Sequence, residues 1–140
     1  MIRILVVDDS TEKKSKVVRV IREAIGKRED VKIDTVTYVI EAKRILSKTT
    51  IDIMILDFCL PLRAEDEPQI DAGIKLLNDI NGSDRYTYPR YVIALSEHEE
   101  LEAEFKLKAG IIHSSILYKP TSNEWSIRLS ESTKAAVSIM

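Results

Sequence analysis

The sequence has little of what disulfide-bonded, nucleic-acid-binding or membrane-spanning proteins require. Cys59 is the only cysteine, so no disulfide can form within the chain. Basic residues number 21 and acidic residues 23, which leaves no basic field that would capture a nucleic acid by itself. The apolar run at the N-terminus, residues 1–7, is too short for a signal-peptide core or a membrane span. We therefore expect a cytoplasmic protein that binds neither nucleic acid nor membrane directly.

The length and the composition are those of one globular domain. A chain of 140 residues can bury a core of its own, and it contains no internal repeat and no low-complexity linker. We expect a single domain over residues 1–140. Its apolar end, AAVSIM at 135–140, is either the end of a helix or the stump of a linker.

Short apolar strands alternate with amphipathic helices along the chain. Apolar and β-branched runs predict strands at residues 2–7, 31–36, 51–56, 91–96 and 114–119. Apolar residues at helical spacing predict helices between residues 8 and 26, at 38–47, 73–80 and 97–110, and after a capping box formed by Thr121 and Glu124. This (βα)₅ order predicts an α/β fold, with a parallel sheet covered by helices on both faces.

Polar side chains follow four of the predicted strands. Asp8 and Asp9 end the first strand, Asp57 ends the third, Ser96 the fourth and Lys119 the fifth. Ligands of open α/β sheets bind outside the carboxyl ends of the strands, at the point where the strand order reverses. We therefore expect these five residues to converge on one pocket.

Three carboxylates in one pocket require a strong counter-charge. Two like charges ~4 Å apart repel by about 4 kcal/mol at an effective dielectric constant of ~20, and one lysine cannot balance three acids. Mg²⁺ prefers oxygen ligands and typically takes one or two carboxylates together with a phosphate oxygen. We therefore expect a Mg²⁺ site formed by Asp8, Asp9 and Asp57, to which the backbone carbonyl of Cys59 could add a fourth oxygen.

The remaining groups suit a phosphoryl group. The Asp57 carboxylate can act as a nucleophile and form an acyl phosphate. Phosphoryl transfer needs positioning and charge neutralisation more than covalent help from the protein. We expect Lys119 to bind one phosphoryl oxygen as a point charge and the Ser96 hydroxyl to donate to another.

Four motifs resemble the response-regulator receiver domain of two-component signalling. They are VVDD at 6–9, ILDFCLP at 55–61, ALS at 94–96 and YKP at 118–120, and the resemblance covers nearly the whole chain in order. It implies the flavodoxin-like fold, with five parallel strands in the order 2-1-3-4-5. It also implies a phosphoprotein switch rather than an enzyme, with self-catalysed phosphotransfer and autodephosphorylation at most.

The resemblance assigns a role to each of these residues. Asp57 would be the phosphoacceptor, Asp8 and Asp9 would hold Mg²⁺, Ser96 would be the switch hydroxyl and Lys119 would contact the phosphoryl group. The donor would be a sensor histidine kinase or a phosphotransfer protein of a phosphorelay. The receiver would signal to an output domain or a partner protein, and a homodimer is left open.

Three features depart from the family pattern. The family glycine that follows the phosphoacceptor corresponds to Gly73, which comes late because an acidic stretch, 62–71, intervenes. That stretch is either a solvated loop or a partner-docking element. Glu97 follows the switch hydroxyl where the family has a small residue. The family aromatic position is Ile116, and Tyr118 lies on the same face of the strand and could replace it.

Two other readings compete with the phosphoacceptor switch. A pseudo-receiver would be a constitutive interaction module whose pocket is blocked by Glu97 and the acidic loop. A haloacid-dehalogenase phosphatase would need a second aspartate two residues after the nucleophile, where this chain has Cys59. The carboxylates could also be simple helix caps, but capping explains neither Ser96 nor Lys119.

Overall fold

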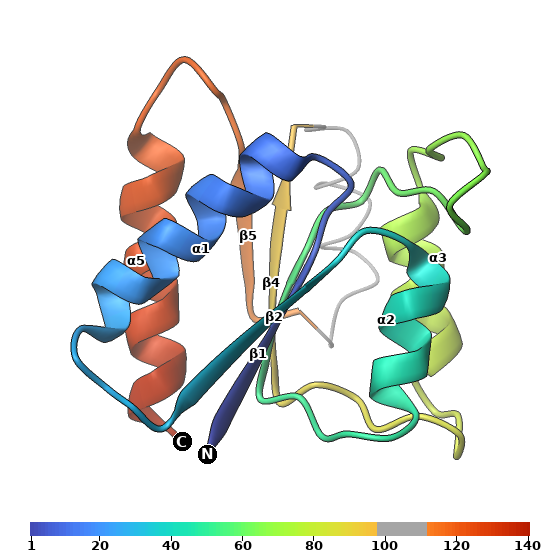
Figure 1. The fold of residues 1–140 in the computed structure, drawn as a ribbon, viewed down its shortest axis with the longest axis horizontal. Coiled ribbons are helices and arrows are strands. Elements are labelled where there is room, and N and C mark those ends of the chain that lie inside the picture. The colour runs from blue at the N-terminus through green and yellow to red at the C-terminus, as the bar shows by residue number, and fades with distance from the viewer. Residues whose placement is uncertain (98–111) are drawn as a thin grey trace.

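A computed structural model describes residues 1–97 and 112–140, which form a five-stranded parallel sheet with helices on both faces (Figure 1). The strand order is β2-β1-β3-β4-β5, which confirms the predicted fold. The strands are β1 (Ile2–Val7), β2 (Val31–Val36), β3 (Ile53–Leu56), β4 (Tyr91–Ser96) and β5 (Ser114–Leu117). The helices are α1 (Thr11–Ile25), α2 (Val39–Leu46), α3 (Ala72–Ile80) and α5 (Glu124–Ser138). Apart from Glu97, the helix predicted at 97–110 lies outside the described residues.

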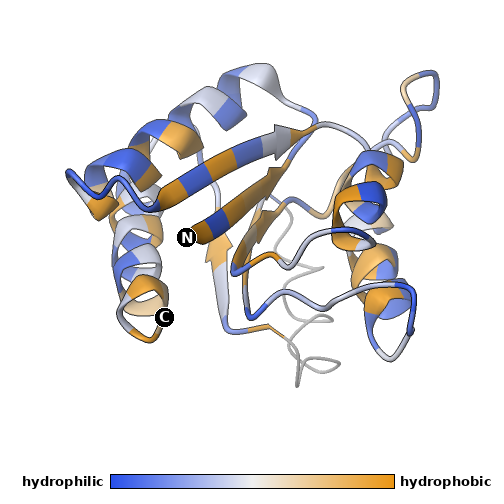
Figure 2. Ribbon diagram, turned by 60° about the horizontal axis from the view of Figure 1, so that its bottom comes forward, coloured by the Kyte–Doolittle hydropathy of each residue, from blue (hydrophilic) through white to orange (hydrophobic). Residues whose placement is uncertain are grey.

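The sheet separates two apolar cores. Because side chains alternate along a strand, Leu5 and Val7 enter one core while Ile4 and Val6 enter the other. Helices α1 and α5 cover the face that carries Ile4, and α2 and α3 cover the opposite face (Figure 1). Hydrophobic residues dominate the central strands, whereas the connecting loops are mainly hydrophilic (Figure 2).

The strand register aligns the carboxyl ends of the three central strands. Val7 of β1 pairs with Leu56 of β3, and Leu56 pairs with Ala94 of β4. The next residue along β1 and β3 is in each case an aspartate, so Asp8 and Asp57 lie at the same level of one sheet edge. Both chain termini lie at the opposite end of the sheet (Figure 1).

Two strands are shorter than predicted. β3 begins at Ile53, although the Asp52 backbone N–H still donates to the Arg3 carbonyl oxygen at 2.9 Å, and the Asp52 carboxylate accepts from the Arg3 backbone N–H at 2.8 Å. β5 ends at Leu117, although the Tyr118 backbone N–H still donates to the Ser96 carbonyl oxygen at 2.8 Å.

The predicted capping box is wrong. Helix α5 begins at Glu124 with Asn123 as its N-cap residue, so Glu124 is too early in the helix to close a box with Thr121. The Ser122 hydroxyl instead accepts a hydrogen bond from the Glu124 backbone N–H at 3.2 Å.

The C-terminal apolar segment continues helix α5. The helix extends to Ser138 and buries Ala136 completely. Within the described residues, no helix is both long enough and apolar enough to cross a membrane.

Candidate functional site

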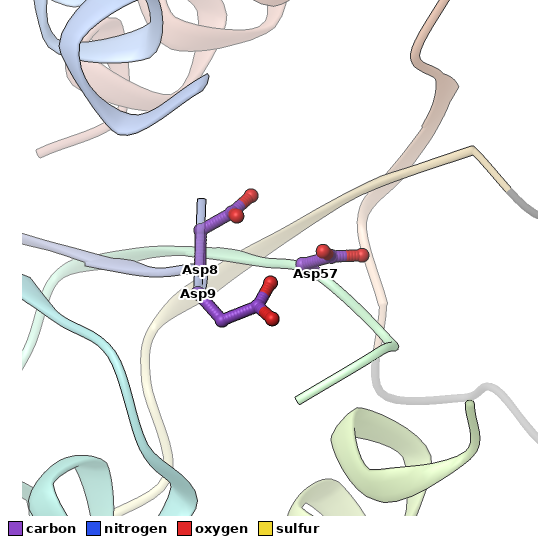
Figure 3. Close-up of side chains that lie close together, drawn as sticks. All are labelled: Asp8, Asp9 and Asp57. Atoms are coloured by element: carbon purple, nitrogen blue, oxygen red, sulfur yellow. The ribbon is translucent and has the colours of Figure 1, made fainter. Parts of the chain in front are cut away.

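Three carboxylates meet at the carboxyl edge of the sheet. Asp8 and Asp9 follow β1, and Asp57 follows β3. Each offers an oxygen within 4.8 Å of the other two, and the three side chains lie close together (Figure 3). Asp8 and Asp57 are buried, with 3% and 9% of their surface exposed. The structure thus brings together the three carboxylates that were predicted to hold a metal.

Backbone hydrogen bonds position two of these carboxylates. The Asp57 backbone N–H donates to the Val7 carbonyl oxygen at 2.9 Å, which ties the end of β3 to β1. One Asp8 carboxylate oxygen accepts from the Ser10 backbone N–H at 2.9 Å, at the start of α1. One Asp57 carboxylate oxygen accepts from the Cys59 backbone N–H at 3.4 Å.

The site disfavours the ionised form of two of its carboxyl groups, as their raised pKa values indicate. Burial raises the pKa of Asp57 from its ordinary 3.8 to about 6, Lys13 opposes this rise and Asp8 adds to it. Burial and the neighbouring Asp8 also raise the pKa of Asp9. A divalent cation would favour the ionised carboxylates, because it supplies two positive charges to oxygen ligands at short range.

Cys59 is suited to act through its backbone rather than its thiol. Burial and the nearby Asp57 raise the pKa of the Cys59 thiol, so the sulfur stays protonated at neutral pH. A protonated thiol is a poor metal ligand, and the candidate donor of this residue is therefore its carbonyl oxygen, as the sequence predicts.

Gly73 lies directly behind the Asp57 backbone. Its N–H donates to the Phe58 carbonyl oxygen at 2.8 Å. A Cβ at this position would lie 2.5 Å from the Asp57 carbonyl oxygen and 2.8 Å from the Phe58 Cα, both closer than van der Waals contact permits. Gly73 therefore packs against the backbone that follows β3, although the acidic stretch 62–71 separates the two in sequence.

That acidic stretch is closed at its base. Leu60 and Gln69 form an antiparallel bridge, with N–H···O distances of 3.1 and 2.9 Å. The carbonyl oxygens of Pro61 and Leu62 accept hydrogen bonds at 3.1 Å from the first two N–H groups of α2. These bonds cap a helix whose N-cap residue, Tyr38, makes no side-chain capping bond.

Lys13 is the site residue that the sequence analysis missed. Its ammonium lies 2.8 Å from an Asp8 carboxylate oxygen and 3.5 Å from an Asp57 carboxylate oxygen. The helix pattern treats lysine as a surface residue, but Lys13 continues the buried stripe of Val17 and Ile21 at a spacing of one helical turn. In the sequence, the spacing of Lys13 from Val17 and Ile21 is the feature that could have indicated a buried lysine near the predicted acidic pocket.

Comparison of the sequence with known proteins finds one relative and no matching family model. The chain is 27% identical over 133 residues to the uncharacterized protein y4jS of Sinorhizobium fredii, an alignment that covers 92% of the chain and 31% of that protein. The chain therefore spans about a third of the length of this curated relative.

Solved structures of receiver proteins superimpose on nearly the whole chain. A CheY-like receiver domain protein from Methanospirillum hungatei gives a TM-score of 0.66 at 19% identity and covers 100% of this chain and 99% of that one. The chemotaxis regulator CheY4 of Vibrio cholerae gives 0.67 at 19% identity, covering 95% and 98%. The chain has the receiver-domain fold. A Mn²⁺-bound form of the response regulator Rcp1 also matches, with a TM-score of 0.64 at 15% identity, covering 94% of this chain and 91% of that one.

The other predicted residues lie at the β4–β5 side of this receiver fold. Ser96 ends β4 and is buried. Lys119 lies two residues beyond β5 and is exposed. Within residues 1–97 and 112–140, Lys119 makes no ion pair with the three aspartates, whereas Lys13 pairs with two of them. The role of Lys119 stays a prediction.

Tyr118 and Glu97 occupy opposite environments. Tyr118 is buried in the same core as Ile116, as strand alternation predicts, and its ring contacts Trp125 at a centroid distance of 4.8 Å. Glu97 is exposed, yet its charge helps to raise the pKa of the Cys59 thiol. The negative charge of Glu97 therefore acts on Cys59, two residues beyond Asp57.

Proposed function

We propose that the chain is a phosphoacceptor receiver domain, formed by residues 1–140, of a cytoplasmic two-component phosphorelay. The observation that carries this proposal is the convergence of Asp8, Asp9 and Asp57 on a receiver fold. The donor would be a phosphohistidine of a sensor kinase or a phosphotransfer protein. Phosphorylation would alter how the domain contacts an output domain or a partner protein.

In the proposed reaction, a carboxylate oxygen of Asp57 attacks the phosphorus atom of phosphohistidine. The new O–P bond forms an acyl phosphate, and the N–P bond breaks with its electron pair returning to the imidazole nitrogen. The hydrogen bond from the Asp57 backbone N–H to Val7, and the one that the carboxylate accepts from the Cys59 backbone N–H, would hold this carboxylate in place during the transfer.

The surrounding residues divide the work of binding and charge neutralisation. Asp8, Asp9, Asp57 and the Cys59 carbonyl would hold Mg²⁺, which when bound would neutralise the charge of the phosphoryl oxygens. Lys119 would bind one phosphoryl oxygen and the Ser96 hydroxyl would donate to another. The exposed Lys119 side chain would have to turn toward Asp57 for this contact.

Labelling by a small phosphodonor tests this function. Acetyl phosphate with Mg²⁺ should phosphorylate Asp57, and mass spectrometry should locate the group on that residue alone. Asp57→Asn should abolish the labelling, whereas Asp52→Asn, at the other end of the same strand, should retain it. Labelling that persists in Asp57→Asn would place the acceptor elsewhere.

One observation favours a second function, the pseudo-receiver. Lys13 already pairs with Asp8 and Asp57, so the pocket has an internal cation of its own. A constitutive interaction module would keep this arrangement and accept no phosphoryl group. This alternative would be established if wild-type protein is not labelled by acetyl phosphate and its Trp125 fluorescence does not change when beryllium fluoride and Mg²⁺ are added.

A further inference from the structure

Lys13 is a buried cation at a position where a positive charge is unfavourable. It lies in the first turn of α1, where the helix dipole disfavours cations. Only 4% of the residue is exposed, so its ammonium has lost most of its hydration. A lysine in such a place must be held by specific partners.

Those partners are three oxygen atoms, of which one accepts a hydrogen bond from the ammonium and two form ion pairs with it. They are an Asp8 carboxylate oxygen at 2.8 Å, the Leu95 carbonyl oxygen at 2.9 Å and an Asp57 carboxylate oxygen at 3.5 Å. The ring of Tyr118 adds a cation–π contact, with its centroid 4.9 Å from Nζ. The contacts come from four separate segments of the chain, which makes this a built position for a cation.

Asp8 and Asp57 are also two of the carboxylates that the proposed function gives to Mg²⁺. We propose that Lys13 is a resident cation that competes with the divalent cation for these carboxylates and so weakens its binding. The inference rests on the proposed function. A bound divalent cation and an ammonium on the same two carboxylates repel each other, so Lys13 must retreat as the metal binds, and this retreat weakens metal binding.

The neighbouring aromatic residues provide an optical report of this competition. The Tyr118 ring contacts both the Lys13 ammonium and the ring of Trp125, which is the only tryptophan of the chain. A shift of Lys13 on metal binding should therefore change Trp125 fluorescence. The same change should be much smaller in a variant without the ammonium.

Magnesium titrations of matched charge variants test the competition. Lys13→Met removes the ammonium, and Lys13→Gln does so while keeping a hydrogen-bond donor for Leu95. Lys16→Met removes the same charge from the same helix, where Lys16 pairs with the exposed Glu12 at 3.2 Å. Asp9→Asn serves as the variant that loses metal binding.

The measurement is the dissociation constant for Mg²⁺, taken by calorimetry at constant ionic strength, with circular dichroism to verify folding. Both Lys13 variants should bind Mg²⁺ at least about ten-fold more tightly than wild type, equivalent to about 1.4 kcal/mol. Lys16→Met should stay within about two-fold of wild type, because its charge is screened at the surface.

The possible outcomes separate this inference from the proposed function. Equal or weaker Mg²⁺ binding by the folded Lys13 variants, with binding lost in Asp9→Asn, overturns the competition and retains the metal site. No Mg²⁺ binding by wild type or by either Lys13 variant overturns both. If neither Lys13 variant folds, a Mg²⁺ titration of wild type that leaves Trp125 fluorescence unchanged overturns the competition.

Discussion

The two halves of the candidate site are built in different ways. On the β1–β3 side, Asp8, Asp57 and Lys13 are buried and joined by ion pairs. On the β4–β5 side, Ser96 is buried but Lys119 is exposed and lies beyond the end of its strand. The charges proposed to bind metal are therefore assembled, whereas the lysine proposed to bind the phosphoryl group makes no ion pair with them within residues 1–97 and 112–140.

The largest expected effect tests the exposed half. Lys119→Met should slow labelling of Asp57 by acetyl phosphate on the order of a hundred-fold, because removing one donor to a developing charge typically costs that much. Its Mg²⁺ affinity should be nearly that of wild type. The control is Lys134→Met, another exposed lysine, which should label at the wild-type rate.

An unchanged labelling rate in Lys119→Met would contradict the proposal that Lys119 binds the phosphoryl group. The lysine that serves the phosphoryl group would then be sought inside the site, where Lys13 already lies 3.5 Å from Asp57.

The buried Asp57 should make the free energy of unfolding depend on pH. The pKa of Asp57 is about 6 in the folded protein against 3.8 ordinarily, so the folded protein binds more protons than the unfolded chain between these values. Its stability should therefore fall as pH rises from about 4 to about 7, by up to about 3 kcal/mol from Asp57 alone.

Denaturant unfolding in the absence of divalent cations measures this effect. Asp57→Asn cannot ionise, so its stability relative to wild type should increase over that pH range. Asp9, whose pKa is also raised, leaves a smaller dependence of the same sign in the variant. Asp84→Asn removes an equal charge from an exposed loop and controls for net charge. Parallel pH curves for wild type and Asp57→Asn would contradict the prediction.

A substitution behind the buried half should damage both stability and labelling. Gly73→Ala places a Cβ against the Asp57 carbonyl oxygen, and we expect a loss of about 1–3 kcal/mol in the free energy of unfolding together with slower labelling. Gly82→Ala is the matched control, since Gly82 has a φ of 79° with no atom near the added Cβ. It should also lose stability, but it should label normally once folded.

The smallest expected effect concerns Glu97, the exposed residue that follows Ser96. Its exposed carboxylate should repel an anionic donor, so Glu97→Ala should speed labelling by up to about ten-fold at low salt and by less at high salt. Glu65→Ala, in the exposed acidic stretch, is the charge control. A rate for Glu97→Ala that equals wild type at low salt would exclude electrostatic gating.

The sequence predicted the parts of the site that depend on strand ends. Asp8, Asp9 and Asp57 follow apolar strands, and parallel strands in register bring such ends together whatever the helices do. Gly73 was also found in spite of the intervening acidic stretch. Its position is fixed by a close backbone contact with Asp57, which the length of that stretch does not alter.

The parts that the sequence did not reveal depend on side-chain direction. Lys13 was missed because a helical pattern separates apolar from polar residues and assigns a charge to the solvent. The exposure of Lys119 depends on β5 ending at Leu117, and alternation alone does not set where a strand stops. A capping box was predicted from residue types at Thr121 and Glu124, but the helix starts too late for it.

The bridge between Leu60 and Gln69 has a consequence for how this domain can diversify. The bridge fixes both sides of the acidic stretch, and the carbonyl oxygens of Pro61 and Leu62 are committed to capping α2. We therefore expect changes in length between residues 63 and 68 to leave β3 undisturbed. We expect the domain to accept new recognition sequences there with the backbone of β3 and the three aspartates unchanged.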